Sequence, residues 1–164
     1  MLFDPENKRK TAPRRADRGF LQLCSDRRFH LKVMNDWSAR DLQRPEMKIG
    51  LGPSKGKDFA TSLGPYVVTP DELGDLKLEM LARVNGEERS RGNMGDMHHS
   101  WDAIVAHAAR NTRLRSGDVL GSGTVGTGCI LEHGDGRWLQ PGDVVELEIE
   151  GIGVLRNTVG PRAA

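Results

Sequence analysis

The sequence has few features that would cross-link the chain or place it in a membrane. It has two cysteines, Cys24 and Cys129, which lie 105 positions apart without a C-x-x-C pair. This pattern favours free, buried thiols in a reducing compartment over a disulfide or a zinc site. No apolar run approaches the roughly 18 residues of a membrane-spanning helix, and no apolar signal segment follows the charged N-terminus. The sequence therefore predicts a cytoplasmic protein without membrane contact.

The chain also lacks an excess of charge of one sign. Its 24 Lys and Arg residues and 23 Asp and Glu residues leave a net charge of +1, which favours neither nucleic acid nor acidic partners. Residues 1–30 differ, because the segment ENKRKTAPRRADRG is basic and has no apolar periodicity. We interpret residues 1–30 as a disordered or non-homologous arm. The alternative, a nucleic-acid or phosphate tether, would favour interleaved aromatic residues, and none are present within ENKRKTAPRRADRG.

The rest of the chain, residues 31–164, is long enough and apolar enough to form one domain. Alternating apolar residues predict strands in FLQLC, RFHLKVM and YVVT, and DLKLEMLARVNGEERSRG predicts a hairpin that turns at Asn85-Gly86. The segment NDWSARDLQ predicts a short helix capped by Asp36 or Ser38, and SWDAIVAHAARN the main helix, capped by Ser100. We expect a loop in KIGLGPSKGKDFATSLGP and short strands in GDVLGSGTVGTGCILE, GRWLQPGDVVELEIEG and GVLRNTV. The predicted fold class is mixed α+β, rich in β-structure, without β-α-β alternation.

The stretch GSGTVGTG at residues 121–128 contains a literal G-x-G-x-x-G, and Asp143 lies about 20 positions past its middle glycine, the spacing of a ribose-binding carboxylate. A dinucleotide fingerprint needs a helix directly after these glycines. The following CILEHGDGRW indicates a strand and a turn, and Asp143 falls in a Pro-Gly-Asp turn. The sequence therefore argues against nucleotide binding.

Three polar clusters are candidates for a functional site. Asp36, Arg40 and Gln43 present a carboxylate, a guanidinium and an amide, or else form a surface helix with an Asp36–Arg40 pair. Lys57 follows a glycine four residues before Thr61; it is either an oxyanion-stabilising lysine or a mobile surface lysine. In the glycine stretch, backbone N–H groups and the Thr124 hydroxyl could contact an oxyanion, unless the stretch is only a tight turn.

Other polar residues are weaker candidates. His98, His99 and His107 have no carboxylate at metal-ligand spacing, which favours structural or surface roles. The segment ELEIE resembles a metal-binding E-x-E, but Val145, Leu147 and Ile149 form the apolar face of the same predicted strand. Glu146, Glu148 and Glu150 are therefore expected to face water.

Taken together, six segments resemble the fumarylacetoacetate hydrolase (fumarylacetoacetase) family from residue 31 to about residue 160. They are VMNDWSARDLQ, KGKDFATSLGPYVVTPDEL, GNMGDM, IVAHAARN, GDVLGSGTVGTGC and WLQPGDVVELEIEGIGVLRNTV, in the family's order. The resemblance implies a fumarylacetoacetase-like β-roll and a homodimer. It also implies cleavage of a C–C bond in a small dicarbonyl or keto acid, of the fumarylacetoacetate or acylpyruvate type.

The family uses a divalent cation, Mg²⁺ or Mn²⁺ with Ca²⁺ as a further alternative, held by an E-x-E pair and an aspartate, to stabilise an enolate. By this resemblance Asp36 and Thr61 correspond to the metal site, Lys57 to the catalytic lysine, and Arg40, Gln43 and Thr124 to substrate-binding positions. In the family the E-x-E pair and the general-base histidine precede the Asp36 motif, and neither is found there in this chain. We therefore expect a β-roll incomplete at its N-terminus and weak metal binding. Alternatives are a lyase, hydratase, decarboxylase or isomerase of related keto acids, a non-catalytic remnant, or a site completed by another chain.

Overall fold

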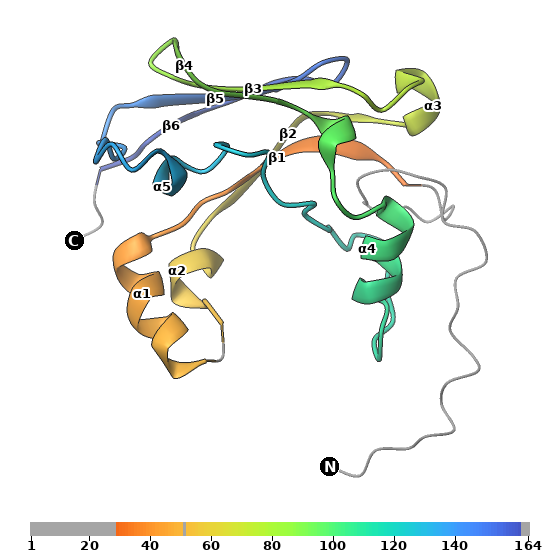
Figure 1. Cartoon of the computed structure of the whole chain (residues 1–164), viewed down its shortest axis with the longest axis horizontal. Helices are drawn as coiled ribbons and strands as arrows, with labels where there is room; N and C mark the ends of the chain where they lie inside the picture. Colours follow the sequence, from red (N-terminus) through yellow and green to blue (C-terminus); the bar gives the residue numbers. More distant parts are fainter. Residues whose placement is uncertain (1–28, 51, 162–164) are drawn as a thin grey trace. The chain divides into compact units, whose positions relative to one another are not determined.

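The computed structural model describes residues 29–50 and 52–161, which form two compact units. The smaller unit contains residues 68–74 and 97–123, and the larger unit contains residues 32–67, 75–96 and those from 124 onward (Figure 1). The predicted FLQLC strand, Cys24 and nearly all of the predicted arm lie outside the described residues. No helix in the described part of the chain is both long and apolar enough to cross a membrane.

The larger unit is built on a four-stranded antiparallel sheet. Its strands are β3 (Glu79–Val84), β4 (Glu87–Asn93), β5 (Val144–Ile149) and β6 (Gly153–Thr158), in the order β4-β3-β5-β6. The predicted hairpin is confirmed: Asn85 and Gly86 join β3 to β4, both with positive φ, as a tight primed turn requires. Val145, Ile149 and Leu155 are buried and form part of the core on one face of the sheet.

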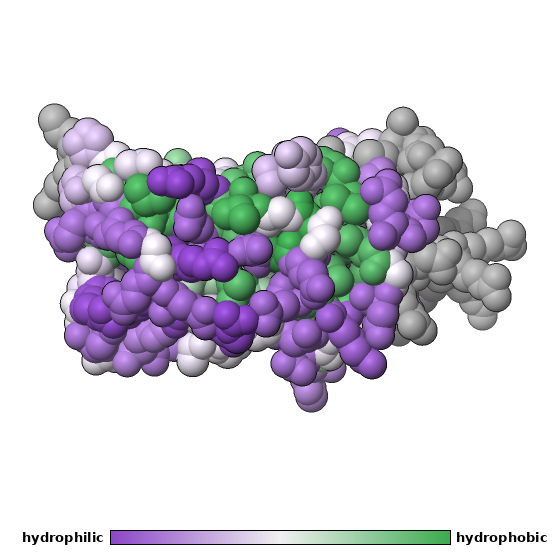
Figure 2. Space-filling view, turned by 90° about the horizontal axis from the view of Figure 1, so that it is seen from above, coloured by the Kyte–Doolittle hydropathy of each residue, from purple (hydrophilic) through white to green (hydrophobic). Residues whose placement is uncertain are grey.

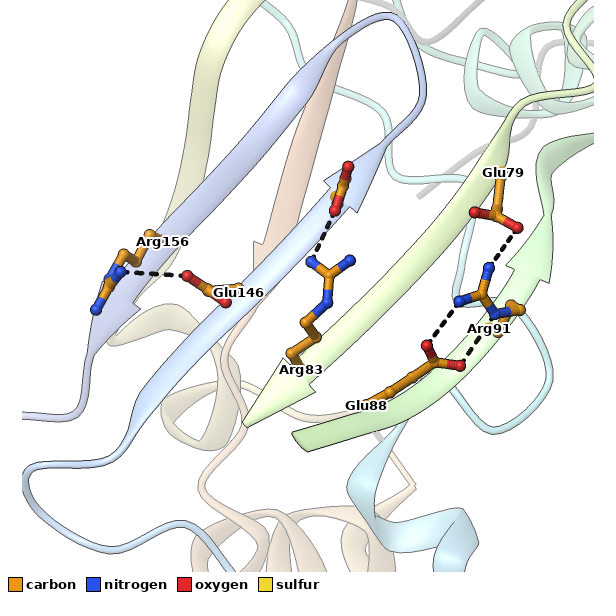
Figure 3. A network of polar contacts seen from close by, with 7 residues as sticks. Glu79, Arg83, Glu88, Arg91, Glu146 and Arg156 are labelled. Atoms are coloured by element: carbon orange, nitrogen blue, oxygen red, sulfur yellow. Dashed lines mark hydrogen bonds and ion pairs between the residues drawn. The ribbon is translucent and has the colours of Figure 1, made fainter. Parts of the chain in front are cut away.

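The opposite face of this sheet carries arginines and glutamates in alternation. Arg83 Nη1 lies 2.7 Å from Glu148 Oε2, and Arg156 Nη1 lies 3.3 Å from Glu146 Oε1 (Figure 3). Arg91 completes the face by pairing with glutamates of both β3 and β4. Figure 2, which views the molecule from above, shows polar side chains over much of the surface with apolar patches between them. Glu146 and Glu148 therefore lie on the face opposite the apolar one, as expected, but are half-buried beside arginines, whereas Glu150 follows the strand and is exposed.

A second, two-stranded sheet pairs β1 (Leu31–Asp36) with β2 (Thr61–Val68). The chain between these strands forms α1 (Arg40–Ile49) and the one-turn helix α2 (Lys55–Asp58), which contact each other (Figure 1). Strand β2 approaches β6 closely, because a Cβ added to Gly153 would lie 3.2 Å from Pro65 Cγ. The small sheet is therefore attached to the large one through β2.

The smaller unit contains α3 (Pro70–Leu73) and α4 (Trp101–Ala108). Helix α4 is the main helix predicted from the sequence, and Ser100 caps it as expected, its Oγ accepting a hydrogen bond from the Ala103 N–H at 3.3 Å. Trp101 and Val105 are buried on one face of α4. The prediction of an apolar face at helical spacing is therefore confirmed here.

One predicted cap and three predicted elements are wrong. Helix α1 has Ala39 at its N-cap without a side-chain cap, so neither Asp36 nor Ser38 caps it. The expected loop at residues 48–65 contains the end of α1, all of α2 and the first half of β2. The segment CILE forms the one-turn helix α5 (Ile130–His133) rather than a strand, and GDVLGSG contains only an isolated bridge at Val119. A 3₁₀ turn, η2 (Met94–Asp96), completes the elements of the described chain.

Candidate active site

The best-defined polar contact joins β1 to α2. Lys57 Nζ lies 2.6 Å from Asp36 Oδ2, and the two side chains retain 26% and 46% of their exposure. Asp36 ends β1 and Lys57 lies within α2, so the fold unites two residues that are 21 positions apart. The alternative Asp36–Arg40 pair is not formed. A partly shielded ammonium group held by a carboxylate is suited to stabilise negative charge on a bound molecule.

A second contact joins α1 to the end of the glycine stretch. Arg40 Nη1 donates to Gln43 Oε1 at 2.6 Å, one helical turn further along α1. Arg40 Nη2 lies 2.8 Å from Cys129 Sγ, as donor to the thiol sulfur. The guanidinium and the amide are thus neighbours, as expected from their spacing, and the contact holds the guanidinium toward Cys129.

Helices α1 and α2 pack closely together between the two contacts. The Ala39 N–H donates to the Gly56 carbonyl at 2.9 Å. A Cβ added to Gly56 would lie 3.0 Å from the Gln43 backbone nitrogen. Gly56 directly precedes Lys57, so its packing against Gln43 fixes Lys57 relative to Arg40 and Gln43.

The two candidate threonines, Thr61 and Thr124, take no part in these side-chain contacts. Thr61 begins β2 and is exposed; the next residue, Ser62, accepts a hydrogen bond from Trp37 Nε1 through its Oγ at 2.9 Å. Thr124 is also exposed, at the start of the glycine turn. Within the described residues neither hydroxyl makes a hydrogen bond, so the structure pairs Lys57 with Asp36 and Arg40 with Gln43 but leaves Thr61 and Thr124 outside these contacts.

The glycine stretch forms a turn anchored on β4. The Gly128 N–H donates to the Val125 carbonyl at 2.8 Å, and Thr127 Oγ1 lies 3.0 Å from Ser90 Oγ. A Cβ added to Gly92 would lie 2.8 Å from the Val125 Cβ, so the turn rests directly on β4. No regular strand precedes the stretch, and the helix that follows it has only one turn. So short a helix lacks the aligned dipole of a nucleotide site. The glycine stretch therefore lacks the long helix of a dinucleotide fingerprint, and the strand expected after it is wrong.

The residues described by the structure do not by themselves fit a divalent cation. They include no group of three His, Cys, Asp or Glu side chains that could hold a metal ion. Asp36 contributes one carboxylate, which is paired with Lys57, whereas hard divalent cations take several oxygen ligands. His98 and His99 contact each other edge to face, with ring centroids 4.7 Å apart, and join no such group.

Two residues of the site were not identified from the sequence. Cys129 is a free, half-buried thiol beside Arg40; the only signal was its place directly after the glycine stretch. Glu46 accepts hydrogen bonds from three backbone N–H groups of the α2 segment, which lower the pKa of its carboxyl group. In the sequence, its position one helical turn after Gln43 was the signal that could have indicated a place for Glu46 near the site.

Comparison with known proteins identifies the family of this chain. Residues 29–160 match the model of the fumarylacetoacetate (FAA) hydrolase C-terminal family. An oxaloacetate tautomerase of Bacillus subtilis, YisK, is 31% identical over 139 residues, which cover 82% of this chain and 44% of that protein. The chain thus spans less than half the length of this curated relative.

Solved structures show the same fold. A fumarylacetoacetate hydrolase from psychrophilic Exiguobacterium antarcticum superposes with a TM-score of 0.70 at 34% identity, over 84% of this chain and 48% of that one. A fumarylpyruvate hydrolase from Pseudomonas aeruginosa, solved with Mn²⁺ and pyruvate, gives a TM-score of 0.69 at 24% identity, over 85% and 57% of the two chains. The described chain, with its mixed α/β architecture, belongs to the fumarylacetoacetate hydrolase family and corresponds to the family's C-terminal domain.

Proposed function

We propose that this chain provides the oxyanion-stabilising part of an enzyme site for a small dicarbonyl or keto acid. The observation that carries the proposal is the joining of Lys57, Arg40 and Gln43 through the contact between α1 and α2. A keto acid has a carboxylate and a carbonyl oxygen, both of which accept hydrogen bonds from cationic and amide donors. Three donors from two adjacent helices match these acceptors.

The residues of the site would have distinct roles. The Arg40 guanidinium has the planar set of donors that binds a carboxylate with two hydrogen bonds. Gln43, which already contacts Arg40, would orient the guanidinium and offer its amide N–H to the carbonyl oxygen. Lys57 would donate to the same oxygen as it gains negative charge, which lowers the barrier to enolate formation. Thr124 would add a hydroxyl contact.

Hydrolytic cleavage of a C–C bond is the first reaction to consider. After water adds to one carbonyl of a 1,3-dicarbonyl acid, the bond between that carbon and its neighbour breaks, and the electron pair remains on the leaving fragment as an enolate. Lys57 would stabilise this enolate. A tautomerase forms an enolate by proton removal alone, and the similarity to the B. subtilis protein favours this as the second candidate.

The metal remains part of this proposal, in a restricted form. Asp36 and Thr61 are candidate ligands from this chain, and a divalent cation would supply Lewis-acid stabilisation of the enolate. Since the described residues do not form a complete ligand set, the other carboxylates would have to come from outside them. We expect the chain alone to bind Mg²⁺ or Mn²⁺ weakly.

Calorimetric titration tests the proposal, with pyruvate as the ligand in the presence and absence of Mn²⁺. R40M and K57M should each weaken pyruvate binding roughly tenfold, the loss of one charge-assisted hydrogen bond. R44M and K55M are matched controls, because Arg44 and Lys55 are exposed cations on the same two helices, and they should bind as the wild type does. Equal binding by all four variants would refute the assigned site, and no Mn²⁺ binding below millimolar concentration would refute catalysis by this chain alone.

A further inference from the structure

Glu46 makes an unusual set of contacts for a half-buried side chain. Its Oε2 accepts hydrogen bonds from the Ser54 and Gly56 N–H groups at 3.0 and 3.1 Å, and its Oε1 accepts from the Lys55 N–H at 2.7 Å. One carboxylate from α1 therefore binds three consecutive backbone donors at the start of α2.

These donors need an acceptor from elsewhere. The first N–H groups of a helix have no partner within it, and a helix of one turn has little stability of its own. Ser54 occupies the N-cap of α2, but its side chain makes no capping bond and its Oγ instead lies 3.2 Å from Asp58 Oδ2. Glu46 thus takes the place of the missing cap from another helix.

The place of Glu46 in α1 connects this cap with the substrate-binding residues. Glu46 follows Gln43 by three residues and Arg40 by six, so all three lie on one helix. At the other end of its contacts, Gly56 precedes Lys57 directly, and Lys57 Nζ reaches Asp36 at 2.6 Å. Two features therefore connect the helix of Arg40 with Lys57. One is the set of hydrogen bonds from the start of α2 to Glu46, and the other is the packing of Gly56 on Gln43.

We propose that Glu46 is a positioning residue, which holds the α2 turn so that Lys57 stays beside Asp36 and at a fixed place relative to Arg40 and Gln43. Its relevance to catalysis rests on the proposed function. Its effect on Lys57 does not, because it concerns the protein without substrate. Glu46 contacts only backbone groups of α2 and acts on Lys57 through them.

Two measurements on the intact chain test this role. Acylation of lysines at one fixed pH, read by mass spectrometry, reports how accessible Lys57 is, and amide hydrogen exchange reports on residues 54–56. In E46Q, one acceptor oxygen and the charge are lost, so the rate of Lys57 acylation and the exchange of these amides should both rise roughly tenfold. D36N should raise Lys57 acylation alone, because it frees the ammonium group without touching the α2 cap.

Matched variants separate positioning from general stability. E132Q neutralises an exposed glutamate of α5 and should leave both readouts unchanged. E46D keeps the charge with a shorter reach, and its rates should fall between those of the wild type and E46Q. Unchanged Lys57 acylation in E46Q would overturn the positioning role even if amide exchange rises. Faster acylation of all lysines, or failure of E46Q and E46D to fold, would overturn it in favour of a merely structural role.

The outcome is independent of the pyruvate titration. A wild-type chain that binds no pyruvate would defeat the proposed function, while the contrast between E46Q and E132Q would still decide whether Glu46 positions Lys57. If both proposals hold, E46Q should also weaken pyruvate binding, and less than K57M does.

Discussion

Substitution of Gly56 by alanine tests the close approach on which the candidate site depends. The new Cβ would lie 3.0 Å from the Gln43 nitrogen and 3.1 Å from the Gln43 Cα, so α1 and α2 would have to separate by a few tenths of an ångström. Overpacking of this kind costs about 1–3 kcal/mol. Alanine regains up to about 1 kcal/mol through its higher helix propensity, although a helix of one turn limits the gain. We expect a net loss of about 1–2 kcal/mol in the free energy of unfolding.

Thermal and urea unfolding measure this loss. For a chain of this size, 1 kcal/mol corresponds to about 2–4 °C in Tm, so G56A should melt roughly 2–8 °C lower. G126A is the matched control, because no atom lies within 4 Å of the position of its Cβ, and it should change the stability by less than about 0.5 kcal/mol. A Tm for G56A at or above the wild-type value would refute the tight contact, and with it the fixed relation of Lys57 to Gln43.

Two further predictions concern the glycine turn and the hairpin. In G92A the new Cβ would lie 2.8 Å from the Val125 Cβ; we expect a loss of about 1–3 kcal/mol in urea unfolding, and a loss below about 0.5 kcal/mol would show that the turn does not rest on β4. The pKa of Asp143 is lowered, first by the Asn85 side chain and then by the Gln140 N–H. Because its folded pKa lies below its unfolded value of about 3.9, Asp143 stabilises the fold above that pH, and the contribution disappears as pH falls through the folded pKa. D143N should therefore be less stable than the wild type near neutral pH, and the difference should shrink in urea titrations at successively lower pH; a constant difference would contradict the assignment.

The elements predicted correctly are those determined by neighbours in sequence. The hairpin follows from Asn85-Gly86, because these residue types accept the positive φ that its turn needs. Helix α4 follows from its apolar spacing and from Ser100. Strand β2 was found only in part, since Gly64 and Pro65 within it are typical of loops. The helix at CILE was missed because a short apolar run does not distinguish helix from strand.

The site divides in the same way. The contact between Arg40 and Gln43 follows from their separation of one helical turn. The contacts Lys57–Asp36 and Arg40–Cys129 span 21 and 89 positions, and only the tertiary fold brings such residues together. Resemblance to a family assigned Asp36 and Lys57 to one site, but their direct pairing, and the capping of α2 by Glu46, required the structure.

The attachment of α1 and α2 between two short strands has a consequence for how this protein could be altered. The candidate residues from Asp36 to Thr61 lie on an excursion of the chain that leaves the small sheet after β1 and returns to it at β2. The four-stranded sheet is held together by hydrogen bonds among its own strands. A two-stranded sheet with one-turn and short helices is a unit of low local stability. We expect this excursion to fluctuate more than the large sheet, although the packing of Gly56 on Gln43 still contributes to the free energy of unfolding. Exposed residues of the excursion that take no part in the contact between α1 and α2 could therefore be exchanged to accept a different acid with little cost to the fold that carries them.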